Sequence, residues 1–327
     1  MNRIRIVTSD SKIWNPVETY ASIVLASQQA YESGLVEIDL LSEGPCCVTS
    51  GIDSMLNSIT GAFGFDPEMY TIITSNQIPS SQYRERRSTW VELGLAQQLA
   101  TKSKLIKPTF KKKFAIFISR SNWQRLGLAT HLRIHHKDQT AITFHFDFTN
   151  DYHISNFGLE ELITKDRSVW SDVYNFIQQL PIRPNIMSYP ILWNQHAFDL
   201  SEQYQDIFCE IVCETYFTGK TFFVTEKTFR CIINRRPFMV QGPKWYLRNL
   251  RALGFKTFGQ WWNEGYDEDP ADARYKTLCY NIDTIAQAST ETIKQWYQEM
   301  QPVLEHNVQV LQQLTNKKVL ETEFFYD

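Results

Sequence analysis

Segments with strand character alternate with segments with helix character through most of this chain, and this alternation constrains the fold more than any other feature. Helix-like runs follow the early strand-like runs, and the first of them, 17–34, ends at a glycine. A second cycle starts at the apolar run FAIFIS, 114–119. Strands that alternate with helices are typical of α/β domains with parallel sheets. The predicted strands of the first cycle are 3–9, 35–42 and 70–77.

A lysine-rich stretch separates the two cycles. KSKLIKPTFKKK, 102–113, contains six lysines and one proline, which is the composition of an exposed linker. The chain has 327 residues, of which 43% are hydrophobic, so it can bury two cores. We therefore expect two Rossmann-like, doubly wound α/β domains, 1–105 and 106–290, and a C-terminal helix and tail, 291–327. Sheets of this kind bind ligands beyond the carboxyl ends of their strands.

Charge and cysteine spacing exclude some classes of protein. The net charge is −3, so no global positive field indicates nucleic acid. The six cysteines have irregular spacing without a C-x-x-C pair, which is typical of reduced thiols in an intracellular protein. No apolar segment is long enough to span a membrane. We therefore expect a cytoplasmic protein without membrane insertion.

The stretch FFVTEKTFR, 222–230, carries the clearest chemical signal. An apolar run that resembles a buried strand stops at Thr225, a suitable N-cap, and Glu226 and Lys227 then stand in the first turn of a predicted helix. A helix N-terminus attracts the diphosphate of a nucleotide, Lys227 and Arg230 add positive charge, and Glu226 can accept ribose hydroxyls. The alternative is that Glu226 only suits the helix dipole and that both cations are solvated.

The surrounding segment, 208–243, resembles the donor-binding signature of the alpha-1,3/4-fucosyltransferases. In that family a strand ends in Glu-Asn, Thr-Glu-Lys opens a helix that carries an arginine, and Gly-Pro follows the next strand. The matching positions here are Glu214, Thr215, 223–227, Arg230, Pro237, Gly242 and Pro243. The resemblance implies the GT-B architecture, in which the N-terminal domain takes the acceptor and the C-terminal domain takes the nucleotide sugar. Thr215 replaces the family's asparagine, so the resemblance supports glycosyl transfer better than fucosyl transfer.

A second segment, 114–132, resembles the first strand and helix of the donor domain in the same family. There an arginine that binds the donor phosphates follows a turn rich in serine and asparagine. Arg125 occupies that place, and Ser119 and Asn122 line the turn. Taken alone, Arg125 is compatible with a surface position on a helix, but its turn follows a strand, where α/β domains bind ligands.

The resemblance does not locate the catalytic base. An inverting transfer needs a carboxylate near the acceptor hydroxyl. By position alone the candidates are Asp10 and Glu18, followed by Glu43 and Asp53. We expect no metal cofactor, because protein cations supply the charge that the leaving diphosphate needs, and the nucleotide sugar is a co-substrate.

The aromatic and acidic region 250–275 offers further candidates. Trp261, Glu264 and Tyr266 are candidate sugar contacts, and packing of the final helices is the alternative. The formal D-x-D at 267–269 stands in a proline-containing acidic loop rather than after a strand, so we predict that it is solvated.

Two further features leave alternatives open. His131 and His135 share a helix face, but no third ligand is apparent, so a zinc site is not predicted. The basic clusters at 84–87 and 102–113 are either solvated faces or a track for DNA phosphates. The acceptor therefore stays undecided between a saccharide and a modified DNA base, as in a bacteriophage-encoded relative. A non-catalytic protein that binds sugar nucleotides is the third hypothesis.

Overall fold

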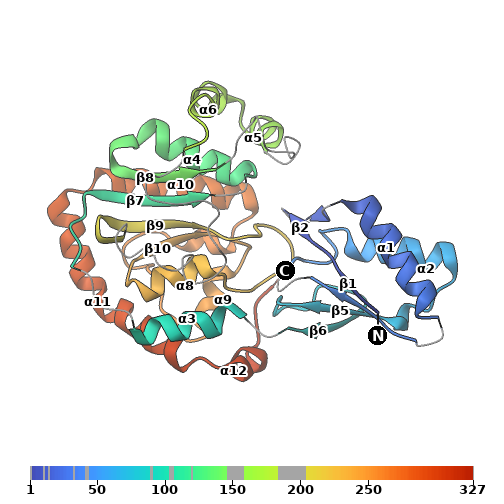
Figure 1. Cartoon of the computed structure of the whole chain (residues 1–327). Coiled ribbons are helices and arrows are strands. Elements are labelled where there is room, and N and C mark those ends of the chain that lie inside the picture. The colour runs from blue at the N-terminus through green and yellow to red at the C-terminus, as the bar shows by residue number, and fades with distance from the viewer. Residues whose placement is uncertain are drawn as a thin grey trace.

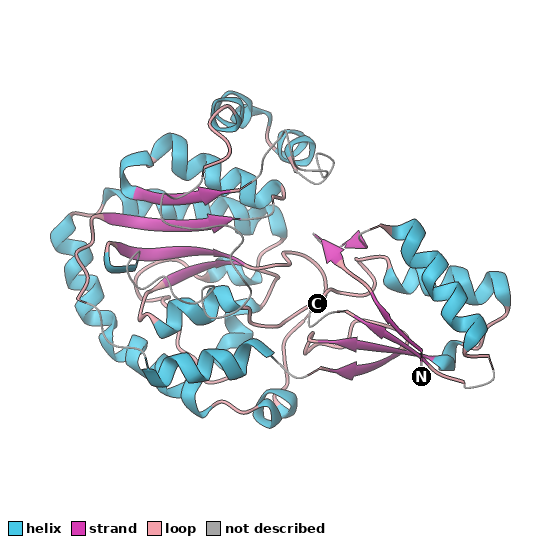
Figure 2. Ribbon diagram, viewed as in Figure 1, coloured by secondary structure: helices cyan, strands magenta, loops and turns pink. Residues whose placement is uncertain are grey.

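The computed structural model describes residues 2–9, 12–13, 15–31, 34–40, 44–88, 91–102, 107–118, 121–145, 158–182 and 204–326. These residues form two α/β units, each built on a four-stranded parallel sheet (Figures 1 and 2). The predicted α/β class with two parallel sheets is confirmed. We call residues 2–88 the first unit and residues 91–326 the second unit. None of the helices in these ranges is long and apolar enough to cross a lipid bilayer.

The first unit has the strand order β1-β4-β5-β6, which follows the chain without reversal. Right-handed crossovers that all advance in one direction place their helices on one face of a sheet. Accordingly, α1 contacts α2, and both lie on the same side of the sheet (Figure 1). The prediction of a doubly wound first domain is therefore wrong for the described residues. The elements of this unit are β1 (Asn2–Arg5), β2 (Thr8–Ser9), β3 (Lys12–Ile13), α1 (Pro16–Gln29), β4 (Val36–Asp39), α2 (Ile52–Phe63), η1 (Pro67–Met69), β5 (Tyr70–Thr74) and β6 (Arg84–Arg87).

The second unit has the strand order β8-β7-β9-β10, which reverses direction beside β7. Helices cover both faces of its sheet: α4 packs with α10 on one face, and α3 and α11 pack with α8 on the other (Figure 1). Its strands and helices are β7 (Lys112–Ile118), α4 (Trp123–His135), η2 (Lys137–Gln139), β8 (Thr140–Phe144), α5 (Leu159–Lys165), η4 (Arg167–Val169), α6 (Trp170–Ile177), β9 (Ile207–Cys213), α8 (Glu226–Ile233), β10 (Phe238–Gln241), α9 (Tyr246–Ala252), η6 (Gly265–Glu268), α10 (Ala271–Gln287), α11 (Thr290–Gln313) and α12 (Asn316–Glu321).

Helix α3 (Val91–Lys102) precedes the lysine-rich stretch but belongs to the second unit. It packs against α8 and α11, and its buried Leu93, Ala96 and Ala100 join the core of the second sheet. The predicted boundary after residue 105 is therefore about one helix too late. An amphipathic pattern shows which face of a helix is buried, but it does not show which sheet covers that face.

The two units meet through the loops at the carboxyl ends of their strands. Segment 216–223, which follows β9, docks on the loop after β5: Asn76 Nδ2 donates to the carbonyl of Lys220 at 2.8 Å, and Asn76 Oδ1 accepts from the amide of Phe222 at 2.9 Å. On the same side, Thr8 Oγ1 lies 2.7 Å from the hydroxyl of Tyr216. The carboxyl ends of both parallel sheets therefore face each other across this contact.

Candidate functional site

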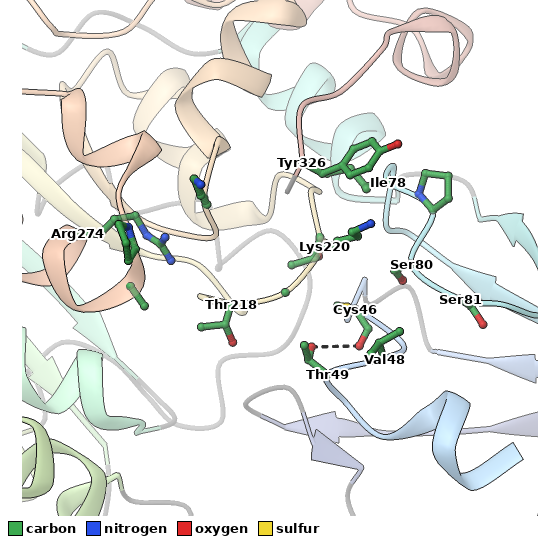
Figure 3. A pocket seen from close by; sticks show the side chains of 16 residues that line it. Cys46, Val48, Thr49, Ile78, Ser80, Ser81, Thr218, Lys220, Arg274 and Tyr326 are labelled. Carbon is green, nitrogen blue, oxygen red and sulfur yellow. Dashed lines mark hydrogen bonds between the residues drawn. The ribbon is translucent and has the colours of Figure 1, made fainter. Parts of the chain in front are cut away.

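A cavity of about 710 Å³ lies between the two units (Figure 3). Loops after the strands of the first unit form one wall. The other wall consists of the loop after β9, Lys244, the start of α10 and the C-terminal tail. Its position matches the place where open α/β sheets bind ligands. The sixteen lining residues are Cys46, Val48, Thr49, Ile78, Pro79, Ser80, Ser81, Thr218, Gly219, Lys220, Thr221, Lys244, Pro270, Ala271, Arg274 and Tyr326.

The cavity is cationic. Lys220, Lys244 and Arg274 line it, and none of the sixteen lining residues is a carboxylate. Lys220 Nζ lies 4.9 Å from the ring centre of Tyr326, and Arg274 Nη2 donates to the carbonyl of Phe217 at 2.6 Å. A concave surface lined by charge of one sign concentrates ligands of the opposite sign. The cavity is therefore suited to an anion.

Glycine is required at position 219, where the two walls are in contact. Gly219 has φ +87°, and a Cβ there would lie 2.6 Å from both the Cβ of Cys46 and the Oγ1 of Thr49. Both the backbone conformation and the lack of space favour glycine. Nearby, the hydroxyl of Thr221 donates to the carbonyl of Gly44. These contacts hold the loop after β9 against the first unit and define the shape of the cavity.

The predicted Thr-Glu-Lys motif does open a helix. Thr225 is the N-cap of α8, and its Oγ1 accepts from the amide of Lys227 at 3.2 Å. Lys227 Nζ lies 2.8 Å from Glu226 Oε1, and both side chains are about one-fifth exposed. Burial alone would raise the pKa of Glu226, but the charge and hydrogen bond of Lys227, together with the charge of Arg230, hold this pKa below its usual range. Neither residue is among the sixteen that line the cavity.

Arg125 stands in the first turn of α4, where Asn122 caps the helix by accepting from the Arg125 amide at 2.9 Å. The buried guanidinium donates from Nη2 to the carbonyl of Glu214 at 2.6 Å. It thereby joins the segment after β7 to the segment after β9. These two strands are neighbours in the sheet, and they lie on either side of the reversal in strand order. Ligands of doubly wound sheets bind at such a point.

Glu214 is a buried carboxylate that holds the start of α8. Its Oε2 accepts from the hydroxyl of Thr225 at 2.6 Å, and its Oε1 accepts from Thr228 and from Tyr246, both at 2.7 Å. Three hydroxyl donors compensate the cost of burying this group. Glu214 therefore stabilises the loop and helix that carry Glu226 and Lys227.

Arg230 points into the protein and not toward the cavity. Its Nε donates to Glu210 Oε2 at 3.2 Å, its Nη2 contacts the other oxygen of Glu210, and its guanidinium lies 5.2 Å from the ring centre of Phe117. Burial alone would lower the pKa of Arg230, but the charge of Glu210 raises it well above its usual range. Arg230 therefore forms a buried ion pair with Glu210, which contradicts both the predicted phosphate contact and the solvated alternative.

Glu264 and Tyr266 pack inside the second unit, whereas Trp261 is half-buried and lines a separate surface pocket with Trp296. The ring of Trp261 lies against Phe258, Glu264 Oε1 accepts from the Phe258 amide at 2.7 Å, and the buried hydroxyl of Tyr266 accepts from the amide of Val240 in β10. None of the three is among the residues that line the cavity. These contacts favour the packing alternative over sugar binding.

The prediction that the D-x-D is solvated is wrong for its first aspartate. Asp267 is buried, and its two carboxylate oxygens accept from the amides of Leu247 and Arg248, each at 2.8 Å. It satisfies donors at the start of α9 that the helix itself leaves unpaired. Asp267 is therefore a capping residue.

The candidate bases have different surroundings. Glu18 is exposed in the first turn of α1 and accepts from the side chain of Asn15. Asp53 is buried and accepts from the amide of Gln82 at 3.1 Å and from the hydroxyl of Ser81, a residue of the cavity wall. Asp10 and Glu43, together with Ser119 of the donor turn, lie outside the described residues.

Several residues beside the cavity were not predicted. Glu85 Oε1 accepts from the amide of Ser80, which lines the cavity, at 3.0 Å, and burial raises the pKa of Glu85. Glu85 was not recognisable because it lies in the charged run RERR, which has no feature of a site. The cations Lys220, Lys244 and Arg274 are too far apart in the sequence to form a motif.

Within the described residues, several side chains of the two basic clusters pair with carboxylates, and residues 103–106 of the lysine-rich stretch lie outside that part of the chain. Arg86 lies 2.7 Å from Glu37 and Arg84 lies 3.5 Å from Glu68 across the first unit. In the lysine-rich stretch, Lys111 lies 3.1 Å from Asp206. These pairs reduce the positive charge that either cluster offers to nucleic acid.

No protein-family model matches this chain, and no match to it was found among the curated proteins or the solved structures.

Proposed function

We propose that the protein is a glycosyltransferase that moves a sugar from a nucleotide-sugar donor to an acceptor hydroxyl. The observation that carries this proposal is the cationic cavity between the two units, at the carboxyl ends of the strands. Its volume of about 710 Å³ suits a nucleotide sugar, since small-molecule sites usually span about 300–1,000 Å³. A diphosphate provides the anion that three cations would select where no carboxylate is among the described lining residues.

In this proposal Lys220, Lys244 and Arg274 bind the diphosphate of the donor. Lys227 and Glu226 lie outside the residues that line the cavity, and we assign them by the sequence pattern to the leaving diphosphate and to the ribose, respectively. Fixed cations aimed at developing charge lower the barrier because they need no reorganisation during the reaction. Protein cations take the place of a metal, so the reaction requires no metal cofactor.

The facing carboxyl ends of the two sheets are consistent with the GT-B arrangement, which we include in the proposal. The first unit then provides the acceptor side, and Glu85 joins Asp10 and Glu18 as a candidate base. A saccharide is the preferred acceptor, because Arg84 and Arg86 are already paired with carboxylates. A cytoplasmic location remains part of the proposal.

A binding experiment tests the site. Nucleoside diphosphates and nucleotide sugars are screened by thermal shift, and the best ligand is then titrated into the wild type and Lys220→Ala. A charge-assisted contact contributes about 1.5–3 kcal/mol, so we expect Lys220→Ala to bind about ten- to a hundredfold more weakly. Lys317→Ala removes a highly exposed lysine of α12 and is the matched control. Equal affinity in the wild type and Lys220→Ala contradicts the site.

Two further measurements separate the alternatives. Slow release of a nucleoside diphosphate without an acceptor argues against a non-catalytic binding protein, because a pure binder returns the donor intact. A DNA complex in a gel, weakening steeply with added salt, would identify DNA as the acceptor. Transfer to saccharides without any such complex supports the preferred acceptor.

A further inference from the structure

Three side chains that can bind a metal converge between the end of α4 and α10. Nε2 of His131 lies 2.8 Å from Asp283 Oδ1, and Nε2 of His136 lies 2.7 Å from the same oxygen. The three potential donor atoms all lie within 4.8 Å of one another. Asp283 follows His136 by 147 residues, so the sequence could not reveal the third ligand. The structure also brings in His136, whereas the sequence pattern pointed to His135.

A third histidine, His135, lies beside this cluster. The ring centre of His135 lies 5.1 Å from that of His131, and its Nε2 lies 3.1 Å from a carboxylate oxygen of Asp172. In the hydrogen-bonded form, His131 and His136 must both carry a proton on Nε2 and donate to one carboxylate oxygen. The same two nitrogens and one oxygen form a metal-binding set when both rings present the Nε2 lone pair instead.

We propose that His131, His136 and Asp283 bind a divalent late first-row metal ion, with Zn²⁺ as the leading candidate. Two imidazole nitrogens and a carboxylate oxygen are established zinc ligands, at about 2.0–2.2 Å from the ion. Tetrahedral ligands at that distance lie about 3.3 Å apart, so the donors need to separate by about 0.5 Å, which small side-chain rotations allow. Water completes the coordination.

Accessibility fits an ion that enters from solvent. The side chains of His131 and His136 are 19% and 13% exposed, whereas that of Asp283 is 45% exposed. The imidazoles are thus held by packing, and the carboxylate is open to water. A partly buried site of this kind holds its ligands in place and still lets the ion and its water ligands enter.

The position of the site indicates its role. Arg125 and Arg274 stand in the first turns of α4 and α10, respectively, whereas the site lies toward the other ends of these helices. Along α4 the separation from Arg125 to His136 is about 16 Å. The ion would therefore fix the packing of the two helices that carry these arginines, and would not take part in sugar transfer. This inference is independent of the proposed function.

The test uses the untagged chain, freed of metal with EDTA and dialysed. We expect equilibrium dialysis with Zn²⁺ to give one bound ion per chain and Zn²⁺ to raise the Tm, because an ion that binds only the folded state stabilises it. Asp283→Asn keeps an oxygen acceptor for the histidines but removes the charged ligand. Since loss of outer-shell partners already lowers metal affinity by about 10–100-fold, we expect loss of a ligand to lower it at least about a hundredfold.

Control variants make the assignment specific. His306→Asn removes a histidine of α11 that contacts the carbonyl of Gly254, and we expect it to bind Zn²⁺ like the wild type. His131→Asn should lose binding, whereas His135→Asn should retain it. No stoichiometric Zn²⁺ binding by the folded wild type would overturn the proposal. Loss of binding in His135→Asn with retention in His131→Asn would also overturn it, because other ligands would then hold the ion.

Discussion

The guanidinium of Arg125 donates a 2.6 Å hydrogen bond to the carbonyl oxygen of Glu214. This contact joins the first turn of α4 to the end of β9, and the carboxylate of Glu214 in turn accepts from Thr225, the N-cap of α8. Residues that the sequence marked in two separate segments therefore meet at the reversal of strand order. Arg125 thus holds the loop after β9 in place. The cations of the cavity, Lys220, Lys244 and Arg274, come later in the sequence.

Lys227→Ala should reduce use of the donor while leaving the fold intact. Its ammonium is partly exposed and contacts Glu226 and, more weakly, the hydroxyl of Thr225, both close neighbours in the sequence, so its removal should change the Tm little. A charge-assisted phosphate contact is worth about 1.5–3 kcal/mol, so kcat/KM for the donor should fall about ten- to a hundredfold. Steady-state kinetics check this expectation. Wild-type donor kinetics in folded Lys227→Ala would mean that the motif is only a helix start.

Glu226→Ala should behave differently from Lys227→Ala. Its proposed contacts are to ribose hydroxyls, which are present before and during the reaction. Loss of such uniform binding raises KM for the donor and leaves kcat nearly unchanged. Initial rates over a range of donor concentrations separate the two parameters. A large fall in kcat at constant KM would argue against a ribose contact.

Arg230→Ala should damage the fold, in contrast to Lys227→Ala. It leaves the carboxylate of Glu210 buried without its charged partner. Breaking a buried ion pair in this way costs about 3–5 kcal/mol. Urea unfolding measures the loss, and the double variant Arg230→Met with Glu210→Leu should recover much of it. Unchanged stability in Arg230→Ala would contradict the buried pair.

Gly219→Ala should separate the walls of the cavity. The added Cβ meets Cys46 and Thr49 at 2.6 Å, and φ is +87°. Gly34→Ala is the matched control, because Gly34 has φ +79° but no atom within 4 Å of its added Cβ. The excess loss of stability in Gly219→Ala over Gly34→Ala should be about 1–3 kcal/mol, the usual cost of overpacking. Equal losses would mean that backbone strain alone is responsible.

Much of the second unit could be predicted from its sequence. The apolar run 114–119 predicted β7, and Thr225 was a recognisable N-cap because side-chain capping is a local property. The apolar run 222–224 was misread as a strand. It forms no ladder, and Phe222 instead bonds to Asn76 of the first unit. A short buried run does not reveal whether a sheet or a domain contact covers it.

The missed features depend on contacts between distant residues. β6 is the charged run RERR, an edge strand without a buried residue, so no apolar alternation marks it in the sequence. Lys220, Lys244 and Arg274 come together only through the fold. The same is true of Asp283, which completes the histidine cluster.

The stability of the protein at acid pH should depend on Glu226. Lys227 holds the pKa of Glu226 below its usual range despite burial, so the folded-state pKa is lower than the unfolded value of about 4.3. Such a group contributes stability above the unfolded pKa, and the contribution is lost as the pH falls through the folded pKa. Glu226→Gln should therefore lose less stability than the wild type between about pH 5 and about pH 3. Urea unfolding at each pH checks this, with the exposed Glu323→Gln as control.

Release of nucleoside diphosphate from a panel of nucleotide sugars, in EDTA and below the Tm, tests the central claim most directly. We expect at least one donor to be hydrolysed slowly without acceptor, in the wild type and Lys317→Ala alike. Lys220→Ala and Lys227→Ala should each lower kcat/KM about ten- to a hundredfold. Failure of the folded wild type to release nucleoside diphosphate from any donor, even with candidate acceptors present, would contradict glycosyl transfer. A strict requirement for Mn²⁺ or Mg²⁺ would contradict the role given to the protein cations.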